Sequence, residues 1–294
     1  MRFSIVHGLV SVLCFLGIVS FTTDALAQAD SSRVSLWKQS LTFSVAGTQS
    51  AFQNWKKGGV NSLAITTILA GQAERKGVLW KWHHDLKLAL GAVKQDTLNF
   101  RKADDQIRYS TSLQYLGDGI FHPTFAAAVE TQFLAGFNYD KNPFGDDRTP
   151  PVKVSDLFSP AYFTQSFGVT YGPVPQFKVR VGVGTKETVV LIPRLRSLYG
   201  VKPDNPIRFE LGAESRTDVD WEVASNVRWQ SRLSLFAAFN KKELPDALWE
   251  NHIKMKVNSW LTTQVEFVAY YDRDVSKRIQ LKEVLALSIG VTLL

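Results

Sequence analysis

The stretch LTTQVEFVAYY at residues 261–271 decides the fold class. Apolar side chains such as Val265 and Phe267 alternate there with polar ones such as Gln264. The same alternation returns at residues 279–293. A period of two is that of a β-strand whose two faces have different surroundings. We therefore expect two amphipathic strands near the C-terminus.

The alternation recurs through most of the chain and predicts fourteen strands, with ends placed to within about two to four residues. Apolar outward and polar inward faces on so many strands are typical of a transmembrane β-barrel. We therefore expect an all-β fold, an antiparallel transmembrane β-barrel of about 14 strands. Twelve is the alternative, because single-chain bacterial barrels contain an even number of strands. The predicted strands are 37–47, 60–74, 79–93, 104–116, 122–138, 161–172, 176–184, 187–193, 206–216, 219–229, 231–240, 247–258, 260–272 and 279–293.

The N-terminus has the pattern of an export signal. An apolar run over 9–21 is followed by the small-x-small site at 25–27. This predicts a cleaved signal peptide over 1–27 and one outer-membrane barrel domain over 28–294. Cys14 is the only cysteine and would leave with the signal, so no disulfide is expected in the mature chain.

The expected connections are of two kinds. Tight, turn-forming links lie at 117–119, 172–175 and 258–259, whereas 140–160 and 240–247 are long and polar. In bacterial outer-membrane barrels the short turns face the periplasm and the long loops face the cell exterior. We expect that orientation here, with both mature termini in the periplasm.

Tryptophans give a separate indication. Trp221 and Trp229 fall on one predicted strand, about 20 Å apart along the membrane normal for a rise of about 3.3 Å per residue and a tilt of about 40°. That spacing suits aromatic girdles at the two edges of an apolar band about 25 Å tall. A large soluble β-sandwich is the alternative, but its tryptophans should favour strand centres.

Charged side chains occupy the inward positions of the predicted strands. A buried charge must be paired or hydrated. Both a salt-bridge network and a narrow wet channel meet that requirement. The candidate residues for this lumen are Asp85, Lys87, Lys178, Arg180, Arg208, Glu210, Arg228, Arg232, His252, Lys254, Lys256, Glu266 and Lys282.

The formal net charge of +7 favours anionic partners. The basic residues alternate with apolar ones instead of forming a patch, which argues against nucleic acid. We expect contacts with outer-membrane lipid, lipopolysaccharide and the barrel-assembly machinery, and small anionic solutes in the lumen.

Signals for catalysis are weak, and no cofactor or metal site is expected. His83 and His84 are adjacent, so a strand would point them to opposite faces. The segment GVGTK at 182–186 lacks the spacing of a phosphate loop and is interpreted as a hairpin turn. The leading hypothesis is a non-enzymatic outer-membrane barrel, either a narrow channel or a structural or surface component. The alternatives are a membrane-embedded lipid-modifying enzyme and a soluble periplasmic β-rich binding protein.

Three segments carry a family resemblance. WKKGGVNS at 55–62, YGV at 199–201 and QLKEVL at 280–285 resemble, in this order, a family of outer-membrane β-barrels of unknown function from Bacteroidota-type bacteria. The resemblance implies a barrel without an established activity, so no catalytic residue is carried over. The chain departs from common outer-membrane barrels by ending in Leu294, not in an aromatic residue. Glu283 also falls on the lipid-facing parity, which requires either a membrane boundary or a shift of register there.

Overall fold

A computed structural model describes most of the chain beyond the N-terminus. The expected signal peptide, with Cys14, and most of the segment 55–62 lie outside the described residues. No helix in the described part is long and apolar enough to cross a membrane. The described residues are 37–50, 61–96 and 98–294.

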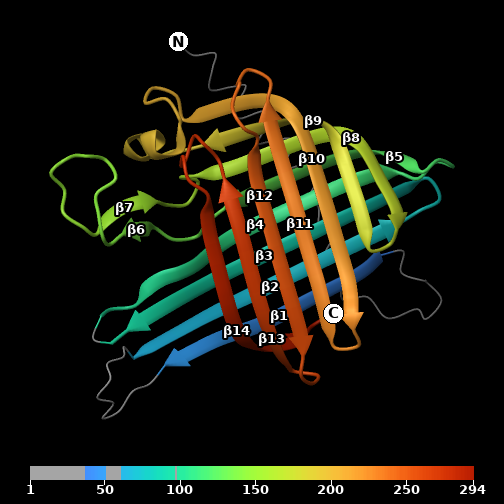
Figure 1. The fold of residues 1–294 in the computed structure, drawn as a ribbon, viewed down its shortest axis with the longest axis horizontal. Helices are drawn as coiled ribbons and strands as arrows, with labels where there is room; N and C mark the ends of the chain where they lie inside the picture. Colours follow the sequence, from blue (N-terminus) through green and yellow to red (C-terminus); the bar gives the residue numbers. More distant parts are fainter. Residues whose placement is uncertain (1–36, 51–60, 97) are drawn as a thin grey trace, which may run out of the picture. The chain divides into compact units, whose positions relative to one another are not determined.

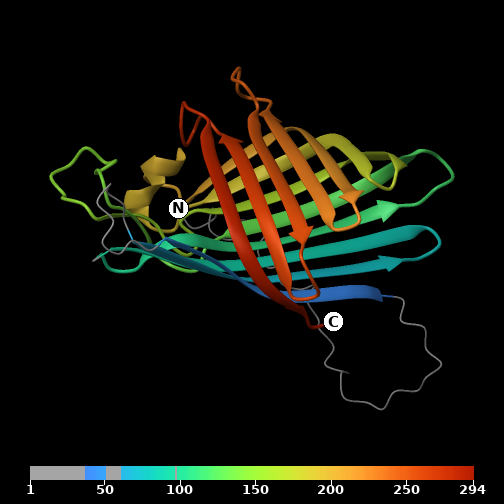
Figure 2. The ribbon, with the colours of Figure 1, turned by 60° about the horizontal axis from the view of Figure 1, so that its bottom comes forward.

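Twelve antiparallel strands form one closed barrel (Figures 1 and 2). Each strand pairs with the next barrel strand along the chain, and β1 closes the wall against β14 with Thr42 opposite Thr292. Closure matters in an apolar surrounding, because every backbone group of the wall needs a partner within it. The barrel strands are β1 (Trp37–Ser50), β2 (Ser62–Lys76), β3 (Trp80–Gln95), β4 (Arg101–Tyr115), β5 (Phe121–Thr131), β8 (Ala161–Val174), β9 (Phe177–Val189), β10 (Ile207–Ala224), β11 (Val227–Ala238), β12 (Asp246–Lys256), β13 (Leu261–Tyr271) and β14 (Gln280–Thr292).

The count of fourteen barrel strands is wrong, and the alternative count of twelve holds. The segments predicted as 176–184 and 187–193 are the single strand β9. No turn interrupts it at 182–186, because its glycines serve close backbone packing instead. A Cβ on Gly182 would lie 2.3 Å from the carbonyl oxygen of Phe167.

The second excess strand comes from the region after residue 206. The segments predicted as 206–216, 219–229 and 231–240 are only two strands, β10 and β11. They meet at the turn 225–226, and the ladder between them pairs Thr217 with Leu233 across the position where a break was expected.

The two ends of the barrel differ in their connections. One end, called the short-turn end, carries the links 77–79, 116–120, 175–176, 225–226 and 257–260. The opposite end, called the long-loop end, carries the connections 132–160, 190–206, 239–245 and 272–279, together with the shorter β3–β4 connection. The predicted separation of tight turns from long polar segments is therefore confirmed.

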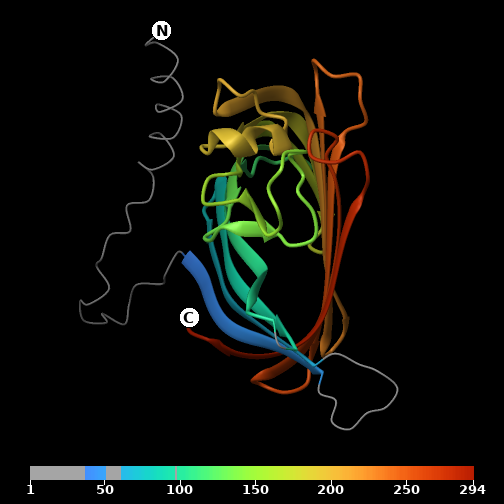
Figure 3. The same cartoon turned by 90° about the vertical axis from the view of Figure 1, so that its left-hand side faces the viewer.

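Two of the long loops are themselves folded. The β5–β8 connection contains the hairpin of β6 (Gly136–Asn138) and β7 (Val152–Ser155), and the β9–β10 connection contains the 3-10 helix η1 (Pro193–Tyr199). Tyr199 donates a hydrogen bond of 2.9 Å to the carbonyl oxygen of Val154, which ties η1 to β7. Figure 3 shows both elements inside the outline of the strands at this end.

A small apolar core holds these loops together. It consists of the buried residues Val190, Leu195 and Val201. This core lies under the folded loops and not between the barrel walls. The loops and their core together therefore cover the long-loop end. The sequence reasoning placed β6 inside one long strand over 122–138 and treated 140–160 as loop, so it missed the hairpin and the 3-10 helix.

The outer face of the wall is apolar and exposed. Leu285 is 65% exposed and Phe209 is 60% exposed, and both lie on the outward parity of their strands. A soluble protein would turn such a face into its core, and exposed apolar surface of this extent marks a site of burial against a partner or a membrane. The pattern is that of a barrel with an apolar surrounding.

The tryptophans do not lie as predicted. Trp221 and Trp229 belong to different strands, β10 and β11, and are register partners beside the turn at 225–226. They are therefore at one level, not about 20 Å apart. Trp80, Trp82 and Trp260 lie at the same short-turn end, so these tryptophans form an aromatic girdle there.

Glu283 lies on the outer face, opposite Phe267, near the start of β14. The β13–β14 ladder runs through it without a shift of register. The charge of Glu283 is therefore accommodated on the outer face because it lies near the long-loop end, and not because a β-bulge shifts the register.

Candidate functional site: the charged lumen

The inner face of the wall carries the charged side chains. Inward orientation is fixed by ion pairs that cross the barrel. Arg108 on β4 donates from Nη1 to both carboxylate oxygens of Glu250 on β12, at 2.8 and 3.1 Å. In the ring of twelve strands, β4 and β12 are six positions apart in either direction, so these strands face each other across the lumen.

The thirteen predicted lumen residues all share the parity of Arg108 and Glu250 through the register of neighbouring strands. Most of them have charged or polar partners. Arg180 pairs with Glu214 at 2.8 Å, Arg228 with Asp220 at 2.6 Å, Arg232 with Asp218 at 2.9 Å and Lys282 with Glu266 at 3.0 Å, while Asp85 accepts a hydrogen bond from Gln72, Arg208 pairs with Glu210, and His252 lies 4.0 Å from Glu266.

A second contact crosses the middle of the lumen. Lys282 on β14 lies 3.5 Å from Asp104 on β4, in addition to its pair with Glu266. Arg232 approaches Glu250 from its other side, at 3.8 Å. The Arg108–Glu250 and Lys282–Asp104 pairs bridge the walls at two levels, the second nearer the long-loop end, so the passage between them is narrow.

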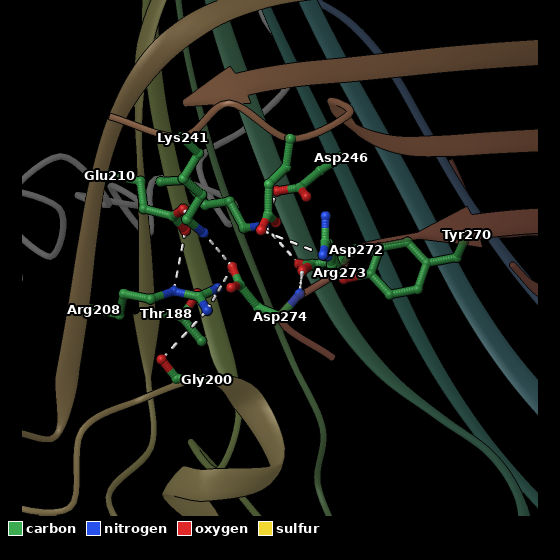
Figure 4. Close-up of polar contacts among 12 residues, drawn as sticks. Thr188, Gly200, Arg208, Glu210, Lys241, Asp246, Tyr270, Asp272, Arg273 and Asp274 are labelled. Atoms are coloured by element: carbon green, nitrogen blue, oxygen red, sulfur yellow. Dashed lines mark hydrogen bonds and ion pairs between the residues drawn. The ribbon is translucent and has the colours of Figure 1, made fainter. Parts of the chain in front are cut away.

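A denser network of charged side chains narrows the long-loop end (Figure 4). Lys186 on β9 lies 2.6 Å from Asp246 on β12 and 2.8 Å from Asp272, which follows β13. Asp272 is 0% exposed, and Tyr270 donates a further hydrogen bond to it at 3.1 Å. A buried carboxylate is tolerated here because a cation and several donors surround it.

The network continues into the loops. Arg208 on β10 lies 2.7 Å from Asp274, and Lys241 lies 2.6 Å from Glu210 and 2.5 Å from Asp274. Lys241 belongs to the β11–β12 connection and Asp274 to the β13–β14 connection. Both loops are thus tied to the wall by charge, and with η1 and the β6–β7 hairpin they cover this mouth.

Electrostatics favours the charged forms of the loop residues. Burial would raise the pKa of Asp272, but the Lys186 ammonium beside it outweighs that effect and holds the pKa below its ordinary value. Burial would likewise lower the pKa of Lys241, and its hydrogen bonds to Asp274 and Glu210 raise the pKa above the ordinary value instead. The network at the long-loop end is therefore ionic near neutral pH.

The half of the lumen toward the short-turn end is different. Lys87, Lys178, Lys254 and Lys256 point into it, and none of them forms an ion pair or a side-chain hydrogen bond within the described ranges. Lys178, Lys254 and Lys256 are exposed although they face inward, so this part of the lumen holds water. The lumen is therefore a basic, wet vestibule below a packed, charge-paired cap.

The histidines occupy separate environments. His83 faces the lumen 3.7 Å from Glu74, and His84 faces outward with Nδ1 2.8 Å from the Tyr109 hydroxyl. The prediction that adjacent histidines point to opposite faces is confirmed. His122 contacts the carbonyl oxygen of Tyr115 at 3.2 Å. Among the described residues, no group of three or more histidine, cysteine, aspartate or glutamate side chains is arranged to hold a metal ion.

Sequence reasoning missed several residues of the network. Arg108 and Glu250 lie on the inward parity of correctly predicted strands, so the alternation could have found them. Lys186 was assigned to a turn, which concealed its inward position. Asp272 lies just beyond β13, where parity carries no information.

Residues 48–137 match the family described as "Protein of unknown function (DUF3078)". No curated protein matches the sequence.

Among solved structures, the chain is similar to outer-membrane β-barrels at low identity. The translocator domain of the autotransporter NalP from Neisseria meningitidis is 8% identical with a TM-score of 0.40, over 97% of this chain and 95% of that one. An outer membrane channel from Pseudomonas putida F1 is 7% identical with a TM-score of 0.40, over 91% and 98%. The NanC porin is 10% identical with a TM-score of 0.36, over 85% and 97%.

Proposed function

We propose that the protein is a non-enzymatic β-barrel of the bacterial outer membrane that forms a narrow passage for small anions. The observation that carries the proposal is the inverted polarity of the closed wall, which is apolar and exposed outside and charged inside. This arrangement suits a lipid surrounding and a wet interior.

The outward face supports a membrane setting in detail. Leu287 and Ile289 on β14 are exposed, and the aromatic girdle lies at the short-turn end. The outward Glu283 lies near the long-loop end, where lipid headgroups would surround it. In this proposal the long loops face the cell exterior and lipopolysaccharide, both mature termini face the periplasm, and the barrel-assembly machinery inserts the exported chain.

The inward face supports a passage for ions instead of large solutes. The pairs Arg108–Glu250 and Lys282–Asp104 cross the lumen at two levels, the second nearer the long-loop end. A narrow low-dielectric passage concentrates the field of its fixed charges, so the unpaired Lys254 and Lys256 would favour anions. We also propose that the protein is related to the outer-membrane barrels of Bacteroidota-type bacteria that residues 55–62 resemble.

The test is conductance of folded protein in planar bilayers, after showing that it partitions with membranes and migrates differently when unheated. We expect small anion-selective currents whose selectivity weakens as salt screens the charges. Changing Lys254 and Lys256 together to glutamate should abolish or reverse the selectivity.

A matched control changes Lys277 and Arg278 to glutamate. These residues are exposed in the β13–β14 connection, so the same change of net charge is made outside the vestibule. Cation selectivity of the wild type, or an absence of current from inserted protein, would contradict the passage. Partition into the soluble fraction would contradict the membrane assignment itself.

A further inference from the structure

We propose that the vestibule contains a specific binding site for a small free oxyanion of the phosphate class, formed by Lys87 on β3 together with His252 and Lys254 on β12. The proposal rests on the barrel function above and names the site in which the anion is held.

The crossing pair brings the two walls of this site together. Lys87 is the register partner of Arg108 on the neighbouring strand, and Arg108 reaches across to Glu250. On β12 the next inward residues after Glu250, toward the short-turn end, are His252 and Lys254. Lys87 therefore faces this stretch of β12, and it lies within electrostatic reach of both residues.

Neither lysine forms an ion pair. In the described part of the chain, neither Lys87 nor Lys254 has a carboxylate within ion-pair distance. The arginines of the lumen differ, since Arg108, Arg180 and Arg228 each hold a carboxylate at 2.6–2.8 Å. These two ammonium groups differ from the lumen arginines in this respect, and Lys178 and Lys256, nearer the short-turn end, share their lack of an ion pair.

The acids nearby are already engaged. Glu250 is held by Arg108, Glu266 by Lys282 at 3.0 Å, and Asp220 by Arg228. The charges of Glu250 and Glu266 also reach Lys87, and those of Asp220 and Asp85 reach Lys254, but none of these carboxylates lies within ion-pair distance of either lysine. Like charges that face each other in a confined lumen repel, so a mobile anion between them restores the balance.

The donor chemistry selects the anion. Each ammonium group carries three N–H donors, and the imidazole of His252 can supply another. Several donors converging from two walls suit an anion with several strong acceptor oxygens better than a halide, because charge-assisted N–H···O⁻ bonds are short and strong. Phosphate and similar oxyanions have this shape.

The route of entry follows from the two ends. Lys254 and Arg228 are exposed within the vestibule, whereas Asp272 and Thr188 at the long-loop end are 0% exposed. A free anion therefore enters from the short-turn end, and a lipid headgroup held in the bilayer would not reach the site through the wall.

The experiment titrates inorganic phosphate into folded, detergent-solubilised full-length protein at constant ionic strength, with calorimetry as the readout. We expect saturable binding, weakened about tenfold or more by Lys87→Met and by Lys254→Met, since each removes charge-assisted hydrogen bonds. Lys277→Met, which removes a charge from the exposed β13–β14 connection, should bind as the wild type does.

A measurement on the wild type alone covers the case in which a variant does not fold. Acetylation of lysines, read by peptide mass spectrometry, should be slowed by phosphate at Lys87 and Lys254 but not at Lys277. Folded protein that shows no saturable binding and no selective protection overturns the site while leaving the membrane barrel intact. Weakening by Lys277→Met equal to that of the lumen variants would overturn it as well, because binding would then follow net charge only.

Discussion

Replacing Arg108 with methionine should destabilise the barrel strongly. The change keeps much of the side-chain volume but leaves the Glu250 carboxylate, 7% exposed, without the donor that contacts both of its oxygens. Arg232 remains near it at 3.8 Å, and the charge of Lys87 reaches it from farther away. Removing one partner of a buried ion pair costs about 3–5 kcal/mol.

Two features place this variant at the lower limit of that range. Arg232 retains part of the attraction, and the vestibule below the pair is hydrated. We therefore expect the free energy of unfolding to fall by about 3 kcal/mol. Replacing Glu250 with leucine in the same chain should recover part of the loss, because apolar residues of similar volume often substitute for a buried pair without cost.

The assay is equilibrium unfolding by urea in phospholipid vesicles, followed by tryptophan fluorescence and by migration of unheated protein. Arg148→Met is the control, since Arg148 pairs with Asp146 on the exposed β6–β7 loop and its loss should leave the midpoint unchanged. Equal stability of Arg108→Met and wild type, or additivity of the two lumen changes, would refute the crossing pair.

Three further predictions address the lipid-facing side of the wall, the orientation of the loops and the charged network at the long-loop end. Leu287→Arg should cost about 2–4 kcal/mol of insertion stability and Ser288→Arg less, because only Leu287 faces lipid; equal insertion of both variants would contradict the assigned faces. Single cysteines at Asp146 and Lys242 should react with an impermeant thiol reagent on intact cells, and protection at both would reverse the orientation. The pKa of Asp272 is lowered in the fold, so its contribution is present at neutral pH. That contribution should be lost as pH falls below about 4, and Asp272→Asn should flatten this part of the unfolding profile measured against pH.

The sequence predicted the wall because lipid outside and water inside impose a period of two on every strand. It failed where that contrast weakens. Thr217 and Ser231 face outward although they are polar, and the predicted breaks fell beside them. The hydroxyl of Ser231 accepts a hydrogen bond from the Trp249 indole at 3.1 Å, which satisfies it on the outer face.

The sequence predicted which face of each strand lines the lumen, but not which residues form pairs there. Alternation placed Lys254 and Glu266 inward, but it could not pair Arg108 with Glu250, because those strands are far apart in sequence and meet only when the barrel closes. The charged network at the long-loop end could not be predicted for another reason. Lys186 lies on the inward parity of β9 but was assigned to a turn, and Asp272 and the loops lie outside the strands, so their contacts depend on tertiary folding.

The central claim is that one face of each strand meets lipid and the other meets a charged lumen. Spin labels placed singly on introduced cysteines along β14 (Gln280–Thr292) test it most directly. The only native cysteine, Cys14, lies in the expected signal peptide and would be removed with it. In vesicles, accessibility to oxygen should peak at Leu285, Leu287 and Ile289 and fall at the residues between them. Accessibility that lacks a period of two, or that peaks at Ala286 and Ser288, would contradict the account.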